Sequence, residues 1–470
     1  MRILLPTGSA TETAVRKAAE GFDADVVITG KIASFLTPHQ LLLLVKKKKY
    51  DAVVVSGMCT ASFEEVERET GVPIYRGPRH AADLAQILPL IGTEITSRTI
   101  PADEFLREER AQRALEQIEK RERAAEADCI IRRMKVGGGS RIKVLAEIMD
   151  AHRREELLMF VERFFSDGAD IVDLGFGFDA TPDDVRRVLT QLDGIDRPIA
   201  VDTQDPALIG AALDRADLIL SLHESNIPVI GREVADAGVA AVVVPGNNSL
   251  QKNIALARKA GIQCIIADPL LQPVGSGFTR SLRGFENLGC PFFFGAGNIV
   301  ELLDADSPGA NALLAGIAAE MGAAIIFTSE HSDKTQGSVR EMRRATEMMV
   351  LARDRPYPKD LGLDLLILKE KRRRREPPLT YAKVVTAKAM PDTISYDPKG
   401  NFRIGIEGDQ IIAVIDERAV AGKRWQDILY TLVSRKNLSH LDHAGYLGME
   451  LYKAELAIRY GRSYEQDGEF

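Results

Sequence analysis

The feature that most constrains the fold is a series of short apolar runs, each followed by a helix-like segment, between residues 141 and 355. The runs read IKVLAEI, DIVDLGFG, PIAVDT, DLILSLHE, AAVVVPGNN, QCIIADPLL, PFFFGAGN and AAIIFTSEHS. Near-continuous apolar strands are typical of parallel sheets that helices cover on both faces. Because eight strand–helix units is the number in a (β/α)8 TIM barrel, we expect that fold. A doubly wound open sheet is the alternative.

The segments on either side of the expected barrel predict two smaller domains and their connections. Residues 1–100 alternate four apolar runs with helices that carry start signals, which predicts a small parallel α/β domain. Residues 101–140 are expected to form a connecting helix and loop. Residues 356–394 contain the basic run KRRRR and a proline pair, and are expected to be a solvated linker. In residues 395–470, Gly-Asp between FRIGIE and QIIAVI predicts a hairpin, so we expect a small α+β module.

The last helix-like segment carries an apolar stripe and ends at Gly461. The residues of the stripe share one helical face: Leu447, Leu451, Ala454 and Ile458. We expect this stripe to pack on the barrel or on a second subunit. We also expect the protein to be a homo-oligomer, most simply a dimer.

Composition excludes several classes of partner. The net charge of −7 and the pI near 5.7 argue against a general affinity for nucleic acid or for acidic membranes. There is no apolar run of about 18 residues that would span a bilayer. The four cysteines are widely separated, which argues against a disulfide framework or a zinc finger and predicts a reducing, cytoplasmic location. These cysteines are Cys59, Cys129, Cys264 and Cys290.

Nearly every apolar run ends in a polar residue. The C-terminal ends of parallel barrel strands meet at one mouth, where the sites of such barrels are built. Carboxylates and amides dominate there, and this acceptor-rich set suits a ligand with many N–H donors, such as an aminopyrimidine ring. Each residue taken alone could simply cap the next helix. The strand-end residues are Glu147, Asp173, Asp202, His223, Glu224, Asn247, Asn248, Asp268, Asn298, Glu330 and His331.

The stretch FTSEHSDKTQGS, which follows the eighth apolar run, contains the candidate catalytic groups. His331 is a candidate acid or base because the ordinary pKa of histidine lies near neutrality. Glu330 and Lys334 flank it in the same loop. Glu224 and Asn247, which follow the fourth and fifth runs, are expected in the binding site itself. An exposed polar loop with no function is the alternative for this stretch.

The motifs DIVDLGFG, IAVDT, IIADP and GAGN, on successive strands, resemble the pterin-binding superfamily. That superfamily includes the dihydropteroate synthases and the methyltetrahydrofolate–corrinoid methyltransferases. The whole chain is similar to the dihydropteroate synthase-related proteins of methanogens and methylotrophs, including their SEHSDKTQGS-like and GYLGMELYKAELAIRYGRSYEQD-like segments. The resemblance implies that Asp202 and Asp268 hold a pterin ring, with Asp173 and Asn298 beside them. Glu147 stands where the synthases have Asn, and is the candidate ligand for Mg²⁺.

The resemblance implies a transferase and leaves three candidate functions. The first is condensation of a dihydropterin diphosphate with an arylamine, a ribofuranosylaminobenzene phosphate, in tetrahydromethanopterin biosynthesis. The second is methyl transfer from a methylated tetrahydropterin. It is favoured by the GAGN sequence at residues 295–298, where the synthases carry a basic motif. The third is a pterin-binding protein without catalytic activity.

Overall fold

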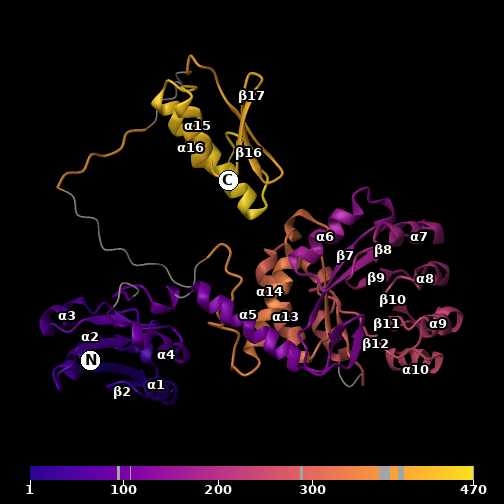
Figure 1. Cartoon of the computed structure of the whole chain (residues 1–470), viewed down its shortest axis with the longest axis horizontal. Coiled ribbons are helices and arrows are strands. Elements are labelled where there is room, and N and C mark those ends of the chain that lie inside the picture. The colour runs from indigo at the N-terminus through magenta and orange to yellow at the C-terminus, as the bar shows by residue number, and fades with distance from the viewer. Residues whose placement is uncertain (93–95, 106, 286–288, 370–381, 390–395, 469–470) are drawn as a thin grey trace. The chain divides into compact units, whose positions relative to one another are not determined.

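The computed structural model describes most of the chain, in two compact units that comprise Met1–Glu376 and Pro377–Phe470 (Figure 1). The basic run KRRRR and part of the expected linker lie outside the described residues. The described ranges are 1–92, 96–105, 107–285, 289–369, 382–389 and 396–468.

The larger part of the first unit is a barrel of eight parallel strands in the order β12-β11-β10-β9-β8-β7-β14-β13. A parallel bridge between Ala267 and Phe292 joins the two outer strands, so the sheet closes on itself. The expected TIM barrel is confirmed, and the open sheet is wrong. The strands are β7 (Lys143–Ile148), β8 (Ile171–Gly175), β9 (Ile199–Asp202), β10 (Leu218–Leu222), β11 (Ala240–Val243), β12 (Ile265–Ala267), β13 (Phe293–Phe294) and β14 (Ile325–Ser329).

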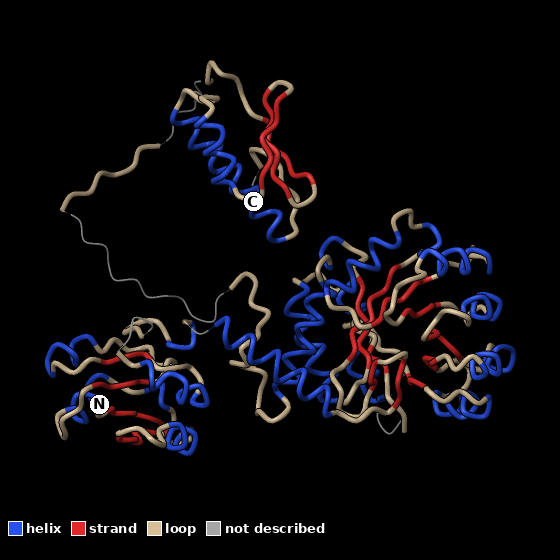
Figure 2. The backbone as a smooth tube through the Cα atoms, viewed as in Figure 1, coloured by secondary structure: helices blue, strands red, loops and turns tan. Residues whose placement is uncertain are grey.

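Helices surround the ring of strands (Figure 2). Apolar residues alternate along each strand, so that Val144 and Ala146 of β7 pack outward against the helices while Leu145 packs inside the barrel. Thr181 begins α7 with a reciprocal capping box to Asp184. The helices are α6 (Leu157–Asp167), α7 (Pro182–Gln191), α8 (Pro206–Ala212), α9 (Ile227–Asp236), α10 (Leu250–Ala260), α11 (Phe278–Ser281), α12 (Gly297–Glu301), α13 (Ser307–Met321) and α14 (Ser338–Ala352).

A helix and a hairpin precede the barrel. The expected connecting helix is α5 (Arg107–Ala124), which packs on α14 through Ile118 and Leu351. The following residues were expected to be a loop, but they form the hairpin of β5 (Cys129–Ile131) and β6 (Met134–Val136), whose three-residue strands are too short to show a clear alternation. Ile131 and Val136 of the hairpin pack into the barrel interior.

The wide spacing of the cysteines argued against a disulfide framework, but the structure contains one disulfide. Cys129 of β5 and Cys264, directly before β12, are joined by it. The two residues are 135 positions apart in the sequence, and only the tertiary fold brings them together. Cys59 and Cys290 remain thiols.

The N-terminal part of the first unit is the small parallel α/β domain that the sequence predicted. Its sheet order is β2-β1-β3-β4, and all pairs of neighbouring strands are parallel. Thr37 caps its second helix with a capping box, as the spacing to Gln40 predicts. The elements are β1 (Ile3–Gly8), α1 (Glu12–Ala18), β2 (Ala24–Gly30), α2 (Pro38–Val45), β3 (Ala52–Val55), α3 (Glu64–Thr70), β4 (Ile74–Arg76) and α4 (Leu84–Ile87).

The second unit is an α+β module with its own core. The hairpin expected around Gly408 is confirmed as β15 (Arg403–Glu407) and β16 (Gln410–Ile415), and β17 (Arg418–Gly422) extends the sheet. Two helices follow, α15 (Trp425–Ser434) and α16 (Leu441–Tyr460).

The apolar stripe of α16 packs inside this module. Leu447, Leu451 and Ala454 are fully buried against Ile411 of the sheet and Leu432 of α15. The expectation that the stripe packs on the barrel or on a second subunit was therefore wrong, because α15 and the third strand had not been foreseen.

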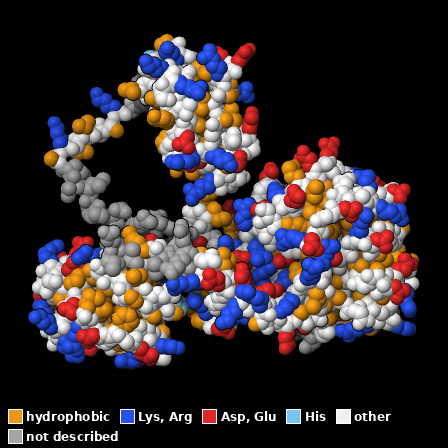
Figure 3. Space-filling view, in the orientation of Figure 1, with side chains coloured by type: hydrophobic (Ala, Val, Ile, Leu, Met, Phe, Trp, Pro, Cys, Tyr) orange, Lys and Arg blue, Asp and Glu red, His pale blue; other side chains and the backbone are white. Residues whose placement is uncertain are grey.

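Charged side chains of both signs are interspersed over the visible face of the barrel (Figure 3). Among the described helices, none combines the length and the apolar character that crossing a membrane requires.

Candidate functional site

Two adjoining cavities lie at the C-terminal ends of the barrel strands. The larger has a volume of about 740 Å³ and lies over the ends of β9 to β14, where Asp202, Asp268 and Asn298 line it. The smaller, of about 480 Å³, lies over the ends of β7 to β9 and is lined by Glu147. Asp202 and Gln204 line both cavities, so Asp202 stands at their junction.

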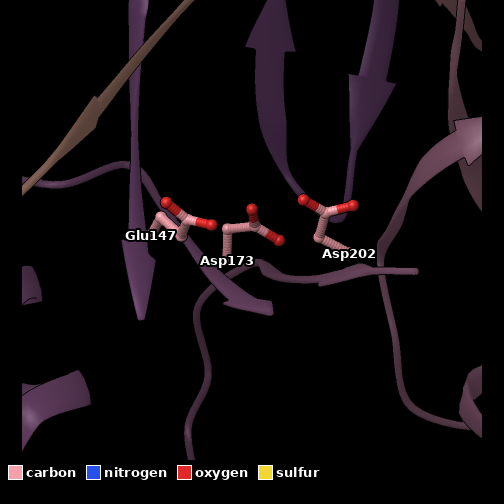
Figure 4. Close-up of side chains that lie close together, drawn as sticks. All are labelled: Glu147, Asp173 and Asp202. Atoms are coloured by element: carbon pink, nitrogen blue, oxygen red, sulfur yellow. The ribbon is translucent and has the colours of Figure 1, made fainter. Parts of the chain in front are cut away.

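Three carboxyl groups from three neighbouring strands meet at this junction. Glu147 of β7, Asp173 of β8 and Asp202 of β9 each place a carboxylate oxygen within 4.8 Å of the other two. Figure 4 shows the three groups side by side. In the register of the parallel strands β7 and β8, Glu147 lies beside Asp173. Asp173 is fully buried, and neither of its carboxylate oxygens has a hydrogen-bond partner among the described residues.

Burial and mutual repulsion disfavour the charged forms of these groups. Burial, reinforced by Asp202 and Glu147, holds the pKa of Asp173 well above its usual range. Burial, with Asp202 and Glu301 nearby, raises the pKa of Glu147 to about 7. Burial raises the pKa of Asp202 to about 6. A cluster of this kind is stabilised by a proton, a cation or a ligand that donates hydrogen bonds.

Asp268 faces the larger cavity from the end of β12. Its Oδ1 accepts a hydrogen bond from the backbone N–H of Leu270 at 2.8 Å, which fixes the side chain. Burial raises the pKa of Asp268 to about 7, and the Asp202 charge adds to this effect. Asn298, in the first turn of α12, lines the same cavity. The structure therefore brings Asp202, Asp268 and Asn298 together around one cavity.

Glu224 and Asn247 also line the larger cavity, but the carboxylate of Glu224 is already engaged. It accepts hydrogen bonds from the backbone N–H of Asn247 at 2.6 Å and from Nδ2 of Asn253 at 2.8 Å. The hydrogen bond from Asn253 is the main cause that lowers the pKa of Glu224 to about 2. Glu224 thus holds the loop between β11 and α10 in place.

The three candidate catalytic residues of the loop after β14 do not line either cavity. The side chain of Glu330 is buried and forms an ion pair with Arg163 of α6. Lys334 donates from Nζ to the carbonyl oxygen of Leu303 at 2.7 Å. The side chain of His331 is exposed. The loop contains a short helical turn at 333–335. Because none of the three residues lines either cavity, the structure does not bring these groups to the carboxyl cluster.

Glu301 at the end of α12 is a residue that the sequence analysis missed. Its carboxylate accepts hydrogen bonds from the Ser329 hydroxyl at 3.0 Å, the His331 backbone N–H at 2.9 Å and the Thr335 hydroxyl at 2.7 Å. It therefore anchors the loop after β14, and its charge contributes to the raised pKa of Glu147. A glutamate within a helix carries no local signal for such a role.

The described lining of the two cavities carries no cationic side chain, because none of its residues is a lysine or an arginine. Arg280 and Arg283 follow β12 and are exposed outside the lining. His223, Ser221 and Gln204 line the larger cavity instead, and supply neutral donors and acceptors.

Comparison with protein families gives one match to part of the chain. A family model described as PterinBD-DUF4346 matches residues 396–467, which lie in the C-terminal module.

Solved structures that resemble the chain include two dihydropteroate synthases. The enzyme of Yersinia pestis with a pterine-sulfa conjugate is 22% identical and covers 45% of this chain and 94% of its own, with a TM-score of 0.37. The enzyme of Thermus thermophilus in complex with 6HMPPP is 22% identical and covers 44% of this chain and 92% of its own, with a TM-score of 0.36. Scores of this size do not assign an activity.

A curated relative covers the whole length. The uncharacterized protein MJ0107 of Methanocaldococcus jannaschii is 34% identical, over 99% of this chain and 98% of its own. Identity of this extent, across all of the domains described above, shows that the chain belongs to the same protein family as MJ0107.

Proposed function

We propose that the barrel mouth binds the ring of a pterin and that the protein is a transferase acting on that pterin. The observation that carries the proposal is the pair of carboxyl groups, Asp202 and Asp268, that face one cavity whose described lining holds no lysine or arginine. A carboxylate accepts two parallel N–H bonds from the guanidine-like edge of an aminopyrimidine. Asn298 adds an amide that both donates and accepts.

Two further observations support this class of ligand. The cavity of about 740 Å³ is of the size of typical small-molecule sites, and apolar side chains such as Leu220, Val242 and Phe293 form part of its wall. A flat aromatic ring can pack against these groups while its polar edge meets the carboxyl groups. The matched family model and the motifs IAVDT, IIADP and GAGN point to pterins as well.

The first candidate reaction is condensation of a dihydropterin diphosphate with an arylamine, as in the biosynthesis of tetrahydromethanopterin. The amine nitrogen forms a bond to the methylene carbon of the pterin, the bond from that carbon to the diphosphate oxygen breaks, and the nitrogen loses a proton. The released proton passes to water.

Mg²⁺ fits the carboxyl cluster by the chemistry of its donors. Glu147, Asp173 and Asp202 offer hard oxygen ligands within reach of one another, and the two oxygens of Asp173 have no other partner among the described residues. Bound there, Mg²⁺ would supply positive charge to a diphosphate leaving group. The chain itself offers no lysine or arginine among the described residues of the lining for that purpose.

That same lining favours a second candidate, methyl transfer from a methylated tetrahydropterin. This reaction has no diphosphate leaving group, and therefore needs no cationic side chain beside the ring. Protonated carboxyl groups such as Asp268, with a pKa raised to about 7, are suited to hold an uncharged ring and to supply a proton. A separate protein or cofactor would have to accept the methyl group.

The test is release of diphosphate by the purified full chain given dihydropterin diphosphate, the ribofuranosylaminobenzene phosphate and Mg²⁺. We expect release that depends on the arylamine and is lost in Asp202→Ala. Asp183→Ala, which changes an exposed carboxylate of α7, is the matched control and should keep it. Pterin binding is measured separately by titration calorimetry. Binding without release would replace condensation by methyl transfer or by a non-catalytic role, and absence of binding would overturn the proposal.

A further inference from the structure

The end of the barrel opposite the carboxyl cluster carries a covalent link between two elements. Cys129 lies on β5 of the hairpin, and Cys264 lies directly before β12; their Cα atoms are 5.6 Å apart. This separation is within the range of protein disulfides. The link therefore joins the hairpin, which precedes the barrel in the sequence, to the sixth strand of the barrel.

Both sulfur-bearing residues are half-buried and border cavities. Cys129 lines a cavity of about 600 Å³ together with Cys290. Cys264 lines a second cavity, of about 460 Å³, beneath β9 and β10. A small thiol or disulfide can therefore approach the link from either side, whereas a structural disulfide in a closed core resists exchange.

The hairpin does not depend on the link alone for its position. Ile131 and Val136 are buried in the interior core of the barrel, where they pack with Leu145, Ile171 and Ala200 among others. Because these apolar contacts hold the hairpin without a covalent bond, the reduced protein is expected to keep its fold. The link can then open and close without global unfolding.

The linked elements lead directly to the candidate site. Cys264 is four positions before Asp268 on the same strand segment. The interior core that contains Ile131 and Val136 also contains Phe293 and Phe327, which line the larger cavity at the mouth. One continuous apolar layer thus connects the hairpin with the floor of the site.

We propose that Cys129 and Cys264 form a reversible thiol–disulfide site that fixes the hairpin to β12 under oxidising conditions. The oxidant is a small-molecule disulfide, such as oxidised glutathione. The Cys129 thiolate attacks one sulfur of that disulfide and releases a small thiol. The Cys264 thiolate then attacks the Cys129 sulfur and releases the second small thiol, so that two protein thiols are oxidised and one disulfide is reduced to two thiols. The site does not depend on the proposed pterin chemistry.

The first test uses the native full chain treated with oxidised glutathione or with dithiothreitol. We expect the oxidised protein to be two hydrogens lighter by intact mass and to yield one cross-linked proteolytic peptide that joins Cys129 to Cys264. Closing a loop of 135 residues should also raise the melting temperature of the barrel, by roughly 10 °C. A peptide that joins Cys290 to either partner, or no cross-linked peptide after oxidation, would overturn the proposal.

Variants separate this site from general effects of oxidation. Cys129→Ser and Cys264→Ser should each abolish the redox-dependent shift in melting temperature. Cys59→Ser, which changes a buried thiol of the N-terminal domain, is the matched control and should retain the full shift. An equal shift in Cys129→Ser would assign the effect to other groups and refute the proposal. The mass measurement on the native chain decides the matter even if a serine variant folds poorly.

Discussion

The carboxylate of Glu330 and the guanidinium of Arg163 form an ion pair of 3.1 Å that joins the end of β14 to α6. The other oxygen of Glu330 accepts the backbone N–H of Val339 in α14 at 3.1 Å. The Glu330 side chain is 1% exposed, whereas that of Arg163 is 42% exposed. This glutamate therefore holds three elements of the barrel together and has both carboxylate oxygens engaged.

We predict that Glu330→Ala lowers the free energy of unfolding of the barrel by about 1–3 kcal/mol, because it leaves the Val339 N–H without a partner and removes the ion pair. Pterin binding should change little. Urea denaturation and titration calorimetry measure the two quantities. His331→Ala, at an exposed side chain, is the control for which both should stay near the native values. If Glu330→Ala lost pterin binding and kept its stability, Glu330 would act in the binding site, as the sequence predicts.

The contribution of Asp202 to the pH dependence of stability is predicted to have the opposite sign to that of most carboxylates. Burial raises the pKa of Asp202 from 3.8 to about 6, so the folded state binds the proton more tightly than the unfolded state. The stability this group contributes is fully present below about pH 4 and is lost as the pH rises through about 6. Asp202→Asn cannot ionise, and should therefore be more stable than the native chain at pH 8, by about 2–3 kcal/mol at most.

Melting temperatures of the native chain and of Asp202→Asn, measured from pH 5 to pH 8, test whether the stability difference grows with pH. The advantage of Asp202→Asn should shrink toward pH 5, where the native carboxyl group is mostly protonated. Asp183→Asn is the control at an exposed position of α7 and should follow the native curve. A difference that is constant with pH would show that the amide acts through packing or hydrogen bonding, and not through the lost charge.

Divalent cations are predicted to bind the carboxyl cluster in competition with protons. Mn²⁺, used in place of Mg²⁺, should raise the melting temperature at pH 8 and do so less at pH 5, because Glu147 has a pKa of about 7 and must lose its proton to bind the ion. Glu147→Gln should remove most of the effect. Titration calorimetry and the electron paramagnetic resonance of Mn²⁺ both report binding without any enzymatic assay. An undiminished Mn²⁺ signal in Glu147→Gln would place the ion elsewhere.

The core of the C-terminal module gives a prediction about stability alone. Leu451 is fully buried between the sheet and α15, so Leu451→Ala should cost about 2–5 kcal/mol. Met449 lies on the same helix but is 53% exposed, and Met449→Ala should cost less than about 1 kcal/mol. Because the module has a core of its own, its unfolding should be resolved from that of the barrel by calorimetry. Equal small losses in both variants would mean that the stripe is not buried as described.

The barrel could be predicted from the sequence because its signal is repeated eight times and each repeat is local. An apolar run that ends in a polar residue is visible in DIVDLGFG or PIAVDT without knowledge of any neighbour. The sequence also predicts that Glu147, Asp173 and Asp202 lie close together, because all three stand near the C-terminal ends of parallel strands, which share one edge.

Features that depend on long-range contacts could not be predicted in this way. The pairing of Cys129 with Cys264 and the hydrogen bonds of Glu301 join residues that no local pattern relates. The direction of a side chain within a loop is equally hidden. Glu330 follows a strand just as Glu147 lies near the end of one, yet Glu330 points to α6 and Glu147 to the mouth.

The composition of the cavity lining has a consequence for the speed with which ligands arrive. The described lining holds Glu147, Asp202, Glu224 and Asp268, and no lysine or arginine. Such a mouth repels an approaching anion, and salt weakens that repulsion over a distance of about 10 Å at 0.1 M. A dihydropterin diphosphate should therefore associate faster as ionic strength rises, whereas an uncharged pterin should associate at a rate that hardly depends on salt.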